Sequence, residues 1–404
     1  MSLSQEKNKT HLQIFSSLPR LFLTAFFLIF GISTAFAAND SPRAASSEAQ
    51  ESLSWTMQII DTGIKPAIAL DASDTPHIAY IREAMMGAVL YAVPGGDGWN
   101  IEQVSQGYFY GPLDIAVTPD GQPVIAYHDH QGEGFDPRLG DEVVAVREDG
   151  AWKLMTVLNP GHDGWDNAIA LDADGHWHTS QVDPAQFGSP DGIEYATDAY
   201  GDLQIERPGT GPVPYEFATS IALREDDSVG ISYFNEPNED LYFAERTPGS
   251  DGTWTLEPVD QEGDVGRYSA LAFDSSGTPH ITYYAADTGA VRHAWRDADG
   301  VWQIEDIDIL ENVVPGQLGA RKITSLDFDS NDVLHVMYSD THQIRYAIQS
   351  DAGWSIQVVY ESEGFDLGQL VEFALDSAGK PHLVFFEIFS TAPFDGNIIY
   401  AIGE

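Results

Sequence analysis

Residues that could bind or transform a ligand gather in short segments between stretches of alternating apolar residues. They are aromatic, histidine and cationic side chains: Tyr108, Tyr110, His128, His130, Arg138, His162, Trp165, Arg267, Tyr268, Arg321, Lys322 and His342. The cations are informative because the chain has only 19 basic residues against 63 acidic ones. Arginine and lysine can hold carboxylate or sulfate groups, and aromatic rings can stack on sugars. The set therefore favours a binding site for an acidic glycan.

A reaction on an acidic polysaccharide is the alternative that these residues allow. β-Elimination from a polyuronate needs a cation to neutralise the uronate carboxylate, a base for the proton beside it and an acid for the leaving oxygen. Arg267 or Arg321 could neutralise the carboxylate. His128 or His130 could be the base, and Tyr268 the acid. A glycoside hydrolase acting on the same polymer belongs to this alternative, and an ordinary solvated loop position competes with each assignment.

Metal binding is a further possibility for the histidines and for the acidic turns. His128, His130 and His162 could hold a metal together, although two residues apart is a weak ligand spacing. The turns at 172–175 and 327–329 contain the clustered carboxylates that calcium prefers. Neither turn has the full EF-hand pattern, and Asp and Gly also suit tight hairpin turns. We therefore assign no metal and no other cofactor, with calcium as the open alternative.

The composition narrows the class of protein. A formal net charge of −44 would repel nucleic acid and anionic lipid, so we expect neither as a partner. Hydrophobic residues make up 43% of the chain, which is enough for a packed core. The chain has no cysteine, which excludes a disulfide framework, a thiol nucleophile and thiolate zinc sites. Such an acidic surface is typical of salt-adapted proteins, so we expect greater thermal stability in molar salt than in dilute buffer.

The N-terminal segment has the features of an export signal. Lys7, Lys9 and Arg20 precede an apolar run from 21 to 36, which ends in small residues. We therefore expect residues 1–37 to be a signal peptide and residues 38–53 a flexible linker. The mature protein would then be secreted or periplasmic, with no membrane span. An uncleaved anchor is the alternative, although the apolar run is slightly short for a spanning helix.

A repeated phrase identifies the elements that must position these residues. Seven copies of a pattern typified by LAFDSSGTPHITY start at residues 68, 115, 169, 221, 271, 326 and 373. A period of about 50 residues with strand-rich units is typical of propeller blades. Each phrase contains two strands. A third strand follows with Tyr-Ala or a variant, as in Tyr91-Ala92, and a fourth begins with tryptophan in most units, as in Trp302.

The two ends of the chain complete each other. The last unit stops at Ile402 without a fourth strand, and a spare fourth strand at 55–60 precedes the first unit. Docking this strand on the last blade closes the ring and covers an exposed sheet edge. We therefore predict an all-β, seven-bladed β-propeller of four-stranded blades over residues 54–404. In propellers, the loops from second to third strand and from fourth strand to the next blade share one face, which would collect the candidate residues.

Several recurring residues are explained by the repeat itself. Histidine recurs at one position, where we expect buried imidazoles bonded to backbone near the turn: His77, His178, His280, His335 and His382. We expect the aromatic residue three places later and the repeated tryptophans to pack in the core. Asp327 departs from the pattern, because the other units have alanine there. A carboxylate in a crowded inner strand must be paired or hydrated, so Asp327 could face the central channel.

The repeats resemble those of secreted bacterial seven-bladed propellers that are grouped with sialidase-type, or BNR-like, repeats. The likeness covers residues 54–404 and rests on the form Asp-x-x-Gly-x-Pro-His-Ile-x-Tyr, as in Asp274 to Tyr283. The Asp-box of sialidases is absent, and no local motif supplies their arginines, tyrosine nucleophile or acidic aspartate. The resemblance therefore implies the fold and not sialidase activity. Some polysaccharide lyases share this architecture, which adds a little weight to the enzyme alternative.

The sequence thus predicts an exported binding or scaffold protein that holds a glycan or an extracellular protein on the loop-rich face of a propeller. The alternative is a polysaccharide lyase or glycoside hydrolase. Clustering of His128, Arg267 and Arg321 in one cleft would favour the enzyme, because base and cation must reach the same sugar. Wide separation around the ring would favour simple binding.

Overall fold

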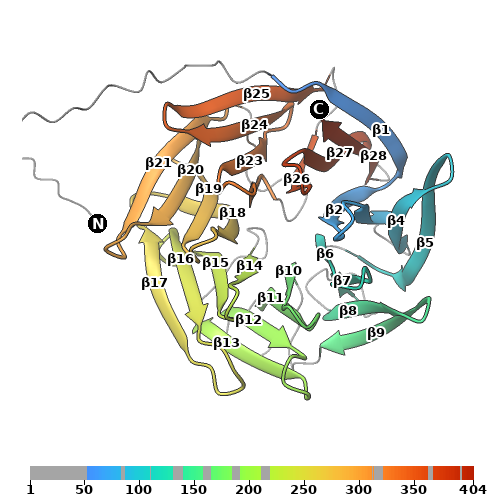
Figure 1. Ribbon diagram of the computed structural model, residues 1–404, viewed down its shortest axis with the longest axis horizontal. Helices are drawn as coiled ribbons and strands as arrows, with labels where there is room; N and C mark the ends of the chain where they lie inside the picture. The colour runs from blue at the N-terminus through green and yellow to red at the C-terminus, as the bar shows by residue number, and fades with distance from the viewer. Residues whose placement is uncertain are drawn as a thin grey trace, which may run out of the picture. The chain divides into compact units, whose positions relative to one another are not determined.

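Seven antiparallel four-stranded sheets make up the chain from Trp55 to Gly403 in the computed structural model. The structure describes residues 52–82, 87–109, 111–130, 140–157, 165–183, 192–210, 219–311, 313, 322–362, 367–391 and 394–404. The sheets stand as blades around a central axis (Figure 1), which confirms the predicted seven-bladed propeller. The expected signal peptide and nearly all of the expected linker lie outside the described residues.

Each blade has its first strand nearest the axis and its fourth strand at the rim. Blade 1 comprises β2 (Ile64–Leu70), β3 (Pro76–Arg82), β4 (Gly87–Gly95) and β5 (Gly98–Gly107). Blade 2 comprises β6 (Leu113–Val117), β7 (Pro123–Asp129), β8 (Asp141–Glu148) and β9 (Ala151–Val157). Blade 3 comprises β10 (Trp165–Leu171), β11 (Trp177–Asp183), β12 (Gly192–Thr197) and β13 (Gln204–Thr210). Blade 4 comprises β14 (Ser220–Leu223), β15 (Val229–Asn235), β16 (Asp240–Arg246) and β17 (Trp254–Asp260).

The remaining blades follow the same plan. Blade 5 comprises β18 (Val265–Phe273), β19 (Pro279–Ala285), β20 (Ala290–Arg296) and β21 (Trp302–Ile309). Blade 6 comprises β22 (Thr324–Phe328), β23 (Leu334–Ser339), β24 (Gln343–Ser350) and β25 (Gly353–Glu361). Blade 7 comprises β26 (Leu367–Leu375), β27 (Pro381–Thr391), β28 (Phe394–Gly403) and β1 (Trp55–Thr62).

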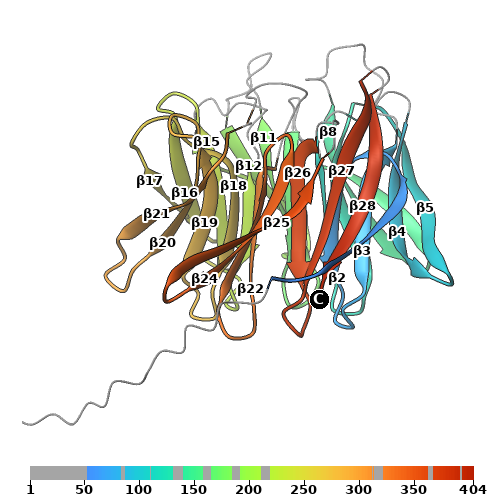
Figure 2. The ribbon, with the colours of Figure 1, turned by 90° about the horizontal axis from the view of Figure 1, so that it is seen from above.

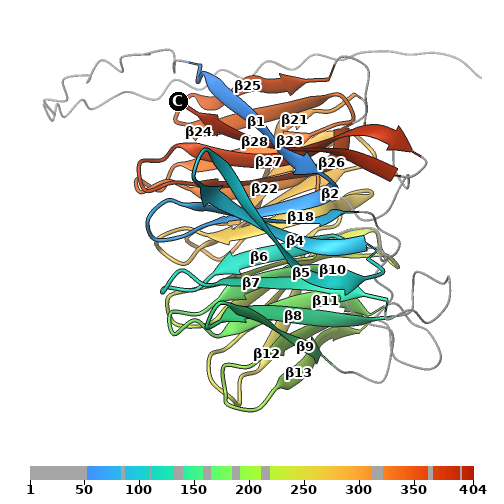
Figure 3. The same cartoon turned by 90° about the vertical axis from the view of Figure 1, so that its right-hand side faces the viewer.

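The strands of every blade run between the same two faces of the ring, as side views show (Figure 2 and Figure 3). On one face the chain passes from second to third strand and from each blade to the next; we call this the loop face. On the other face lie the short turns between first and second and between third and fourth strands; we call this the hairpin face. Among the described residues, we find no helix with the length and apolarity to cross a membrane.

The ring is closed by the N-terminal strand, as predicted. β1 pairs antiparallel with β28, from Trp55 opposite Gly403 to Thr62 opposite Asn397. Just outside this ladder, Ser54 and Glu404 exchange two backbone hydrogen bonds of 3.0 and 2.8 Å. Leu53, at the end of the expected linker, donates its amide to the side chain of Gln357 in blade 6. The last blade therefore has no bare edge where β28 would otherwise end the sheet.

The recurring histidines lie between a turn aspartate and an aromatic residue of the third strand. His77 Nδ1 is 2.6 Å from the Tyr91 hydroxyl, and its Nε2 is 3.5 Å from Asp71. The same arrangement holds at His178, His335 and His382, and in blade 5 His293 replaces the tyrosine. Burial lowers the pKa of all five imidazoles. The predicted burial is therefore right, but the predicted backbone partner is wrong.

The turn aspartates and Asp327 use their carboxylates on backbone amides. Asp71 Oδ1 accepts hydrogen bonds from the amides of Ser73 and Thr75, and the equivalent turns repeat this pattern. Such side-chain caps close a tight turn locally. Asp327 accepts from its neighbour Phe328 and from Leu375 of blade 7 at 2.9 Å, so its carboxylate joins two inner strands. Burial raises the pKa of Asp327.

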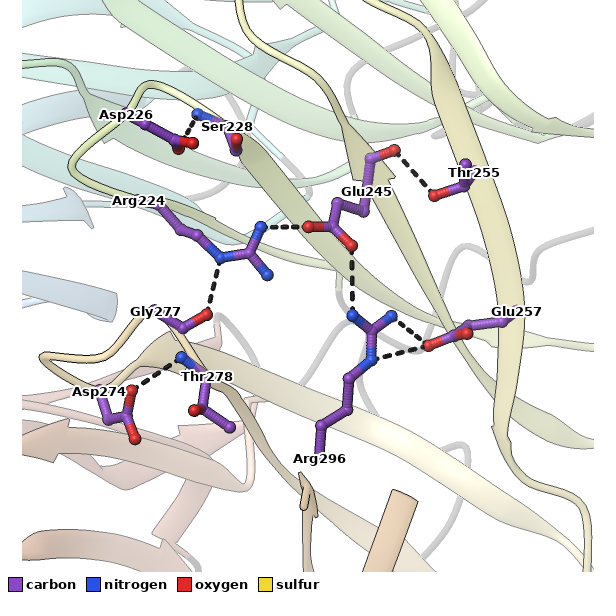
Figure 4. Close-up of polar contacts among 10 residues, drawn as sticks. All are labelled: Arg224, Asp226, Ser228, Glu245, Thr255, Glu257, Asp274, Gly277, Thr278 and Arg296. Carbon is purple, nitrogen blue, oxygen red and sulfur yellow. Dashed lines mark hydrogen bonds and ion pairs between the residues drawn. The ribbon is translucent and has the colours of Figure 1, made fainter. Parts of the chain in front are cut away.

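Three of the repeated tryptophans, in blades 4, 5 and 6, take part in a contact between blades that we call the rim clasp. A glutamate on the fourth strand of one blade accepts a hydrogen bond from the indole N–H of the next blade's tryptophan. The pairs are Trp254 with Glu206, Trp302 with Glu257 and Trp354 with Glu305. Arginines on the third strand join two of these glutamates, Arg246 at Glu206 and Arg296 at Glu257. Figure 4 shows Arg296 bridging Glu257 and Glu245, with Arg224 on the far side of Glu245.

Candidate functional site

The loop face carries the described part of the predicted site. Tyr108, His128, His130, Arg267, Tyr268, Lys322 and His342 all lie at or next to strand ends on that face. Tyr110, Arg138, His162 and Arg321 lie outside the described residues. Trp165 begins β10, and its side chain is likewise outside what the structure describes. The topology of the blades therefore puts the described candidates on one face, although not in one place around the ring.

Tyr108 and His130 lie together where blade 1 passes into blade 2. The His130 amide donates to the Tyr108 carbonyl oxygen at 2.9 Å, and the two ring centroids are 6.3 Å apart. His130 is fully buried, whereas Tyr108 is partly exposed. A hydroxyl and an imidazole are thus held close together at the edge of the loop face.

His128 lies two residues before His130, near the end of β7, and is buried. It is 1% exposed and stands directly opposite Glu142, the second residue of β8. Glu142 is 0% exposed, and burial raises the pKa of its carboxyl group to about 8; the Thr179 hydroxyl works against this shift and Glu194 adds to it. Blade 2 therefore carries a histidine and a carboxylic acid side by side just below the loop face.

Arg267 and Tyr268 are already engaged within the fold. The Arg267 guanidinium makes a bidentate ion pair with Asp264, with Nε 2.6 Å from Oδ1, and lies over the Phe234 ring. Tyr268 is 1% exposed and packs near Tyr284. Its φ of +57° falls within β18, where the register with β19 shifts between Arg267 and Ala270, and its carbonyl accepts the Thr324 hydroxyl at 3.0 Å.

These two residues do not meet the histidines of blade 2. Blade 5, which carries Arg267 and Tyr268, stands across the ring from blade 2 (Figure 1). His342 lies in blade 6, where its ring contacts the Thr341 hydroxyl at 2.7 Å. The single-cleft arrangement of His128 with Arg267 is therefore absent among the described residues, and Arg321 lies outside them.

The innermost strands and the residues just before them bring together a set of charged side chains that we call the inner ring: Lys65, Asp114, Asp166, Lys322 and Glu372. Lys322 Nζ is 2.7 Å from Glu372 Oε1 of blade 7. Burial opposes the charge of Lys322, but the carboxylates of Asp114 and Glu372 together raise its pKa. Lys65, at the start of β2, is 6% exposed, and burial lowers its pKa to about 8 against the opposing charge of Asp166. Two of the few lysines thus lie near the axis beside carboxylates of other blades.

Sequence reasoning found Lys322 but missed Lys65, Asp114, Asp166 and Glu372. A signal existed for two of them, because Asp114 and Glu372 occupy the position just before the repeated phrase, where the other units have alanine or serine. Each also accepts a backbone N–H from the next inner strand, Asp114 from Ile169 at 3.0 Å and Glu372 from Ile68 at 3.3 Å. Lys65 and Asp166 precede the phrase in segments of variable sequence, which hides them from a repeat comparison.

The inner ring can recognise polar groups rather than catalyse a reaction alone. Paired ammonium and carboxylate groups offer fixed donors and acceptors, which suit hydroxyl, carboxylate or sulfate groups. Among the described residues, no group of three or more histidine or acidic side chains is arranged to hold a metal ion. The metal alternative built on His128, His130 and His162 includes a residue outside that part of the chain.

Comparison with known proteins gives the class of architecture. No protein-family model matches the chain, and no curated protein sequence matches it. The structure is similar to the BP39L lectin from Burkholderia pseudomallei, with 15% identity, a TM-score of 0.58, and coverage of 81% of this chain and 96% of that one. It is also similar to a PL25 ulvan lyase bound to -[GlcA(1-4)Rha3S]-, with 14% identity, a TM-score of 0.55, and coverage of 87% and 96%.

A third similar structure is a protein of unknown function from Dyadobacter fermentans, with 12% identity, a TM-score of 0.50, and coverage of 86% and 99%. At these identities the likenesses show the fold alone. They confirm the propeller part of the resemblance to secreted bacterial propellers and contain nothing specific to sialidase-type repeats. The chain is a seven-bladed β-propeller of the architecture that a lectin and a polysaccharide lyase also use.

Proposed function

We propose that this protein is an exported carbohydrate-binding propeller that holds a glycan on its loop face. The observation that carries the proposal is the inner ring, in which Lys65 and Lys322 lie beside Asp166 and Glu372 near the axis. In a chain of net charge −44, two lysines near the axis of the ring are a marked local departure. The similarity of the fold to a lectin and to a glycan-cleaving enzyme supports the same class of ligand.

The chemistry of the face fits a glycan better than a protein partner. Sugars present many hydroxyl groups, which bind best to side chains that are already held in place by other bonds. Lys322 is held by Glu372, and Arg267 is held by Asp264. Partly exposed Tyr108 adds an aromatic ring of the kind on which sugar rings stack. A glycan carrying carboxylate or sulfate groups would gain most, because the lysines are its natural partners.

A glycan-binding panel with two lysine variants tests this proposal. We expect the purified protein to bind an acidic glycan, and Lys65→Met and Lys322→Met to weaken that binding at least about tenfold, or about 1.4 kcal/mol. The matched control is Lys380→Met, because Lys380 is exposed in a turn of the hairpin face and carries the same charge. Equal binding by all four proteins would remove the inner ring from the proposal, and absence of binding across a broad panel would remove glycan binding itself.

Polysaccharide lyase activity is the second candidate, favoured by one observation. Tyr108, partly exposed on the loop face, is a candidate acid, and His130, buried with its ring centroid 6.3 Å away, is a candidate base that a bound polymer would have to reach. β-Elimination needs both groups within reach of one sugar unit. Arg267 is less suited to neutralise the uronate at this pair, because it lies in blade 5, across the ring.

The lyase candidate is tested by absorbance of unsaturated uronates and by release of reducing ends. We expect both signals to rise together with an acidic polysaccharide, and Tyr108→Phe to lower kcat about 100-fold with little change in KM. The variant keeps the aromatic ring and removes only the hydroxyl group, so we expect it to fold like the wild-type protein, and a lower kcat then reports on the hydroxyl group. Reducing ends without unsaturated uronate would mean hydrolysis, and silence in both assays would leave binding as the function.

A further inference from the structure

The contact between blades 2 and 3 departs from the repeat on both sides at once. The third strand of most blades carries an aromatic residue, such as Tyr91, at one repeated position. Two places before that position, six blades have a buried aliphatic residue, such as Val89 or Val291, whereas blade 2 has Glu142. In six blades the phrase ends in Tyr or Phe, as in Tyr283, whereas blade 3 ends it with Gln181. Cross-strand from Glu142, blade 2 has His128. Polar residues therefore replace apolar or aromatic residues on both sides of the contact between blades 2 and 3.

These residues face one another across the two blades. On β7 and β8, Val124, Ala126 and Val144 pack against blade 3, and His128 and Glu142 continue the same faces because side chains alternate along a strand. On β11 and β12, Trp177 and Ala196 pack against blade 2, and the same faces continue with the polar residues Thr179, Gln181 and Glu194. We call this set the polar chamber. All five polar residues are at most 1% exposed.

The hydrogen bonds of the polar chamber run in two short chains. The Thr179 hydroxyl donates to Glu142 Oε2 at 3.1 Å. The Gln181 amide nitrogen donates to Glu194 Oε2 at 3.1 Å, and Arg207 of β13 makes an ion pair with the other carboxylate oxygen of Glu194. These bonds use the hydroxyl of Thr179 and the amide donor of Gln181.

Two buried oxygens remain without a donor. Glu142 Oε1 and Gln181 Oε1 accept no hydrogen bond from any residue in the described part of the chain. A buried acceptor without a partner costs about 1–3 kcal/mol, so two of them in one contact need an explanation. Among the described residues, the charged side chains bonded in the polar chamber are the carboxyl groups of Glu142 and Glu194 and the guanidinium of Arg207, and His128 is a further titratable group there. Both orphan oxygens are acceptors, so the partner that joins them is either a cation or the proton of a neutral Glu142, whose pKa burial raises to about 8.

We propose that the polar chamber binds one small hard cation, calcium or magnesium, through Glu142 Oε1 and Gln181 Oε1. Carboxylate and amide oxygens are the ligands that such ions choose, and an ion held by few side chains keeps water in its remaining positions. The ion supplies the charge that the two oxygens lack and joins blade 2 to blade 3. This inference is independent of the proposed glycan binding, because it concerns a contact between blades below the loop face.

Ion binding by the full chain tests the inference. The purified protein is stripped with a chelator, and calcium or magnesium chloride is then added at constant ionic strength. Isothermal titration calorimetry measures stoichiometry and Kd, and thermal unfolding measures the shift in Tm. We expect one ion per chain and a Tm that rises with ion concentration. Glu142→Gln weakens the Kd at least about tenfold, which corresponds to about 1.4 kcal/mol.

Two further variants keep the test decisive. Asp260→Asn is the matched control, because it removes a buried carboxylate whose oxygens are already bonded to Tyr283 and to the Glu262 amide; it keeps the wild-type Kd. Gln181→Tyr restores the residue of the repeat and abolishes ion binding even if Glu142→Gln fails to fold. The inference is overturned if the wild-type protein binds no ion, or if Glu142→Gln binds it with the wild-type Kd. The two oxygens would then share a proton.

Discussion

The contact between blades 4 and 5 and the contact between blades 2 and 3 occupy equivalent places in the ring but are built differently. Between blades 4 and 5, the rim clasp joins Trp302 to Glu257. Figure 4 shows Arg296 bonded to the same glutamate. Closer to the axis, the Tyr283 hydroxyl donates to Asp260 at 2.6 Å. Between blades 2 and 3, Met155 stands where the clasp glutamate would be and Leu203 where the tryptophan would be.

The difference shows that both partners of the clasp, the glutamate and the tryptophan, are absent together at the contact between blades 2 and 3. A glutamate in place of Met155 would have no indole to bond, and a tryptophan in place of Leu203 would have no acceptor. At the same contact Gln181 replaces the inner tyrosine and Glu142 replaces an aliphatic residue. The inner Tyr or Phe and the aliphatic residue are kept in the six other units, so a contact that only had to hold blades together would keep both. The contact between blades 2 and 3 is therefore specialised, and the contact between blades 4 and 5 represents the structural standard.

Replacing Tyr283 of blade 5 by glutamine, the residue that blade 3 has at this position, should break the contact between blades 4 and 5. Tyr283→Gln removes a fully buried ring and its bond to Asp260, so we expect a loss of about 3–5 kcal/mol in the free energy of unfolding. Urea unfolding measures it. Tyr283→Phe, which loses only the hydroxyl bond, should cost about 1 kcal/mol. Similar losses in the two variants would show that the ring itself contributes little.

Acid should act on blade 3 through a group that blade 2 does not have. Burial lowers the pKa of His178 to about 4, while blade 2 has Val124 at that position. Between about pH 4 and 6.5 the unfolded chain binds this proton and the folded chain does not, so stability falls as the pH falls through that window. We expect the loss to be about 3 kcal/mol smaller in His178→Gln. Urea unfolding at pH 7 and pH 4 measures it, and parallel losses in the two proteins would contradict the assignment.

Removing the clasp arginine should weaken the contact between blades 4 and 5 by less. Arg296 is bonded to Glu257 and Glu245 and is 21% exposed, so Arg296→Met should lower the free energy of unfolding by about 2 kcal/mol. The control is Lys153→Met, because Lys153 pairs with Glu148 on the exposed surface, where the loss of an ion pair leaves stability unchanged. Equal unfolding midpoints for the two variants would mean that the clasp is only a surface ion pair.

Building the clasp between blades 2 and 3 should have the smallest effect. Met155→Glu and Leu203→Trp together restore both partners, and we expect a favourable coupling of about 1 kcal/mol between them. A double-mutant cycle in urea measures the coupling. Each single variant lacks its partner and should be neutral or destabilising. Simple additivity would show that the two blades do not bring these positions together as they do elsewhere.

The fold was predictable because its information is repeated. Seven phrases, a fourth strand missing at the C-terminus and a spare strand at 55–60 specify the number of blades and the closure. Each strand needs only local alternation and a turn, and the repeat averages out local exceptions. The partners of His77 were not predictable with the same ease, because the tyrosine that bonds it is on the third strand and lies outside the phrase.

The site was less predictable because its contacts connect blades. Lys322 and Glu372 are 50 residues apart, and only the geometry of the ring brings them to 2.7 Å. The partner of Arg267 was hidden in the same way, because Asp264, which lies three residues before it and holds its guanidinium, is outside the repeated phrase. The departures at Glu142 and Gln181 were readable in the repeat, but their meaning required knowing that both residues face the same contact.

The pairing of β1 with β28 imposes an order on the making of this protein. β1 is the first strand of the ring to be synthesised, and its partner is the last; Ser54 and Glu404, which bond just beyond the ladder, are 350 positions apart. Blades 1 to 6 can form as the chain grows, since each of their sheets is built from consecutive strands. The seventh cannot, and contacts of such long separation form slowly. The growing chain therefore carries an unpaired strand until β28 has been made, and the ring becomes a closed circle only then.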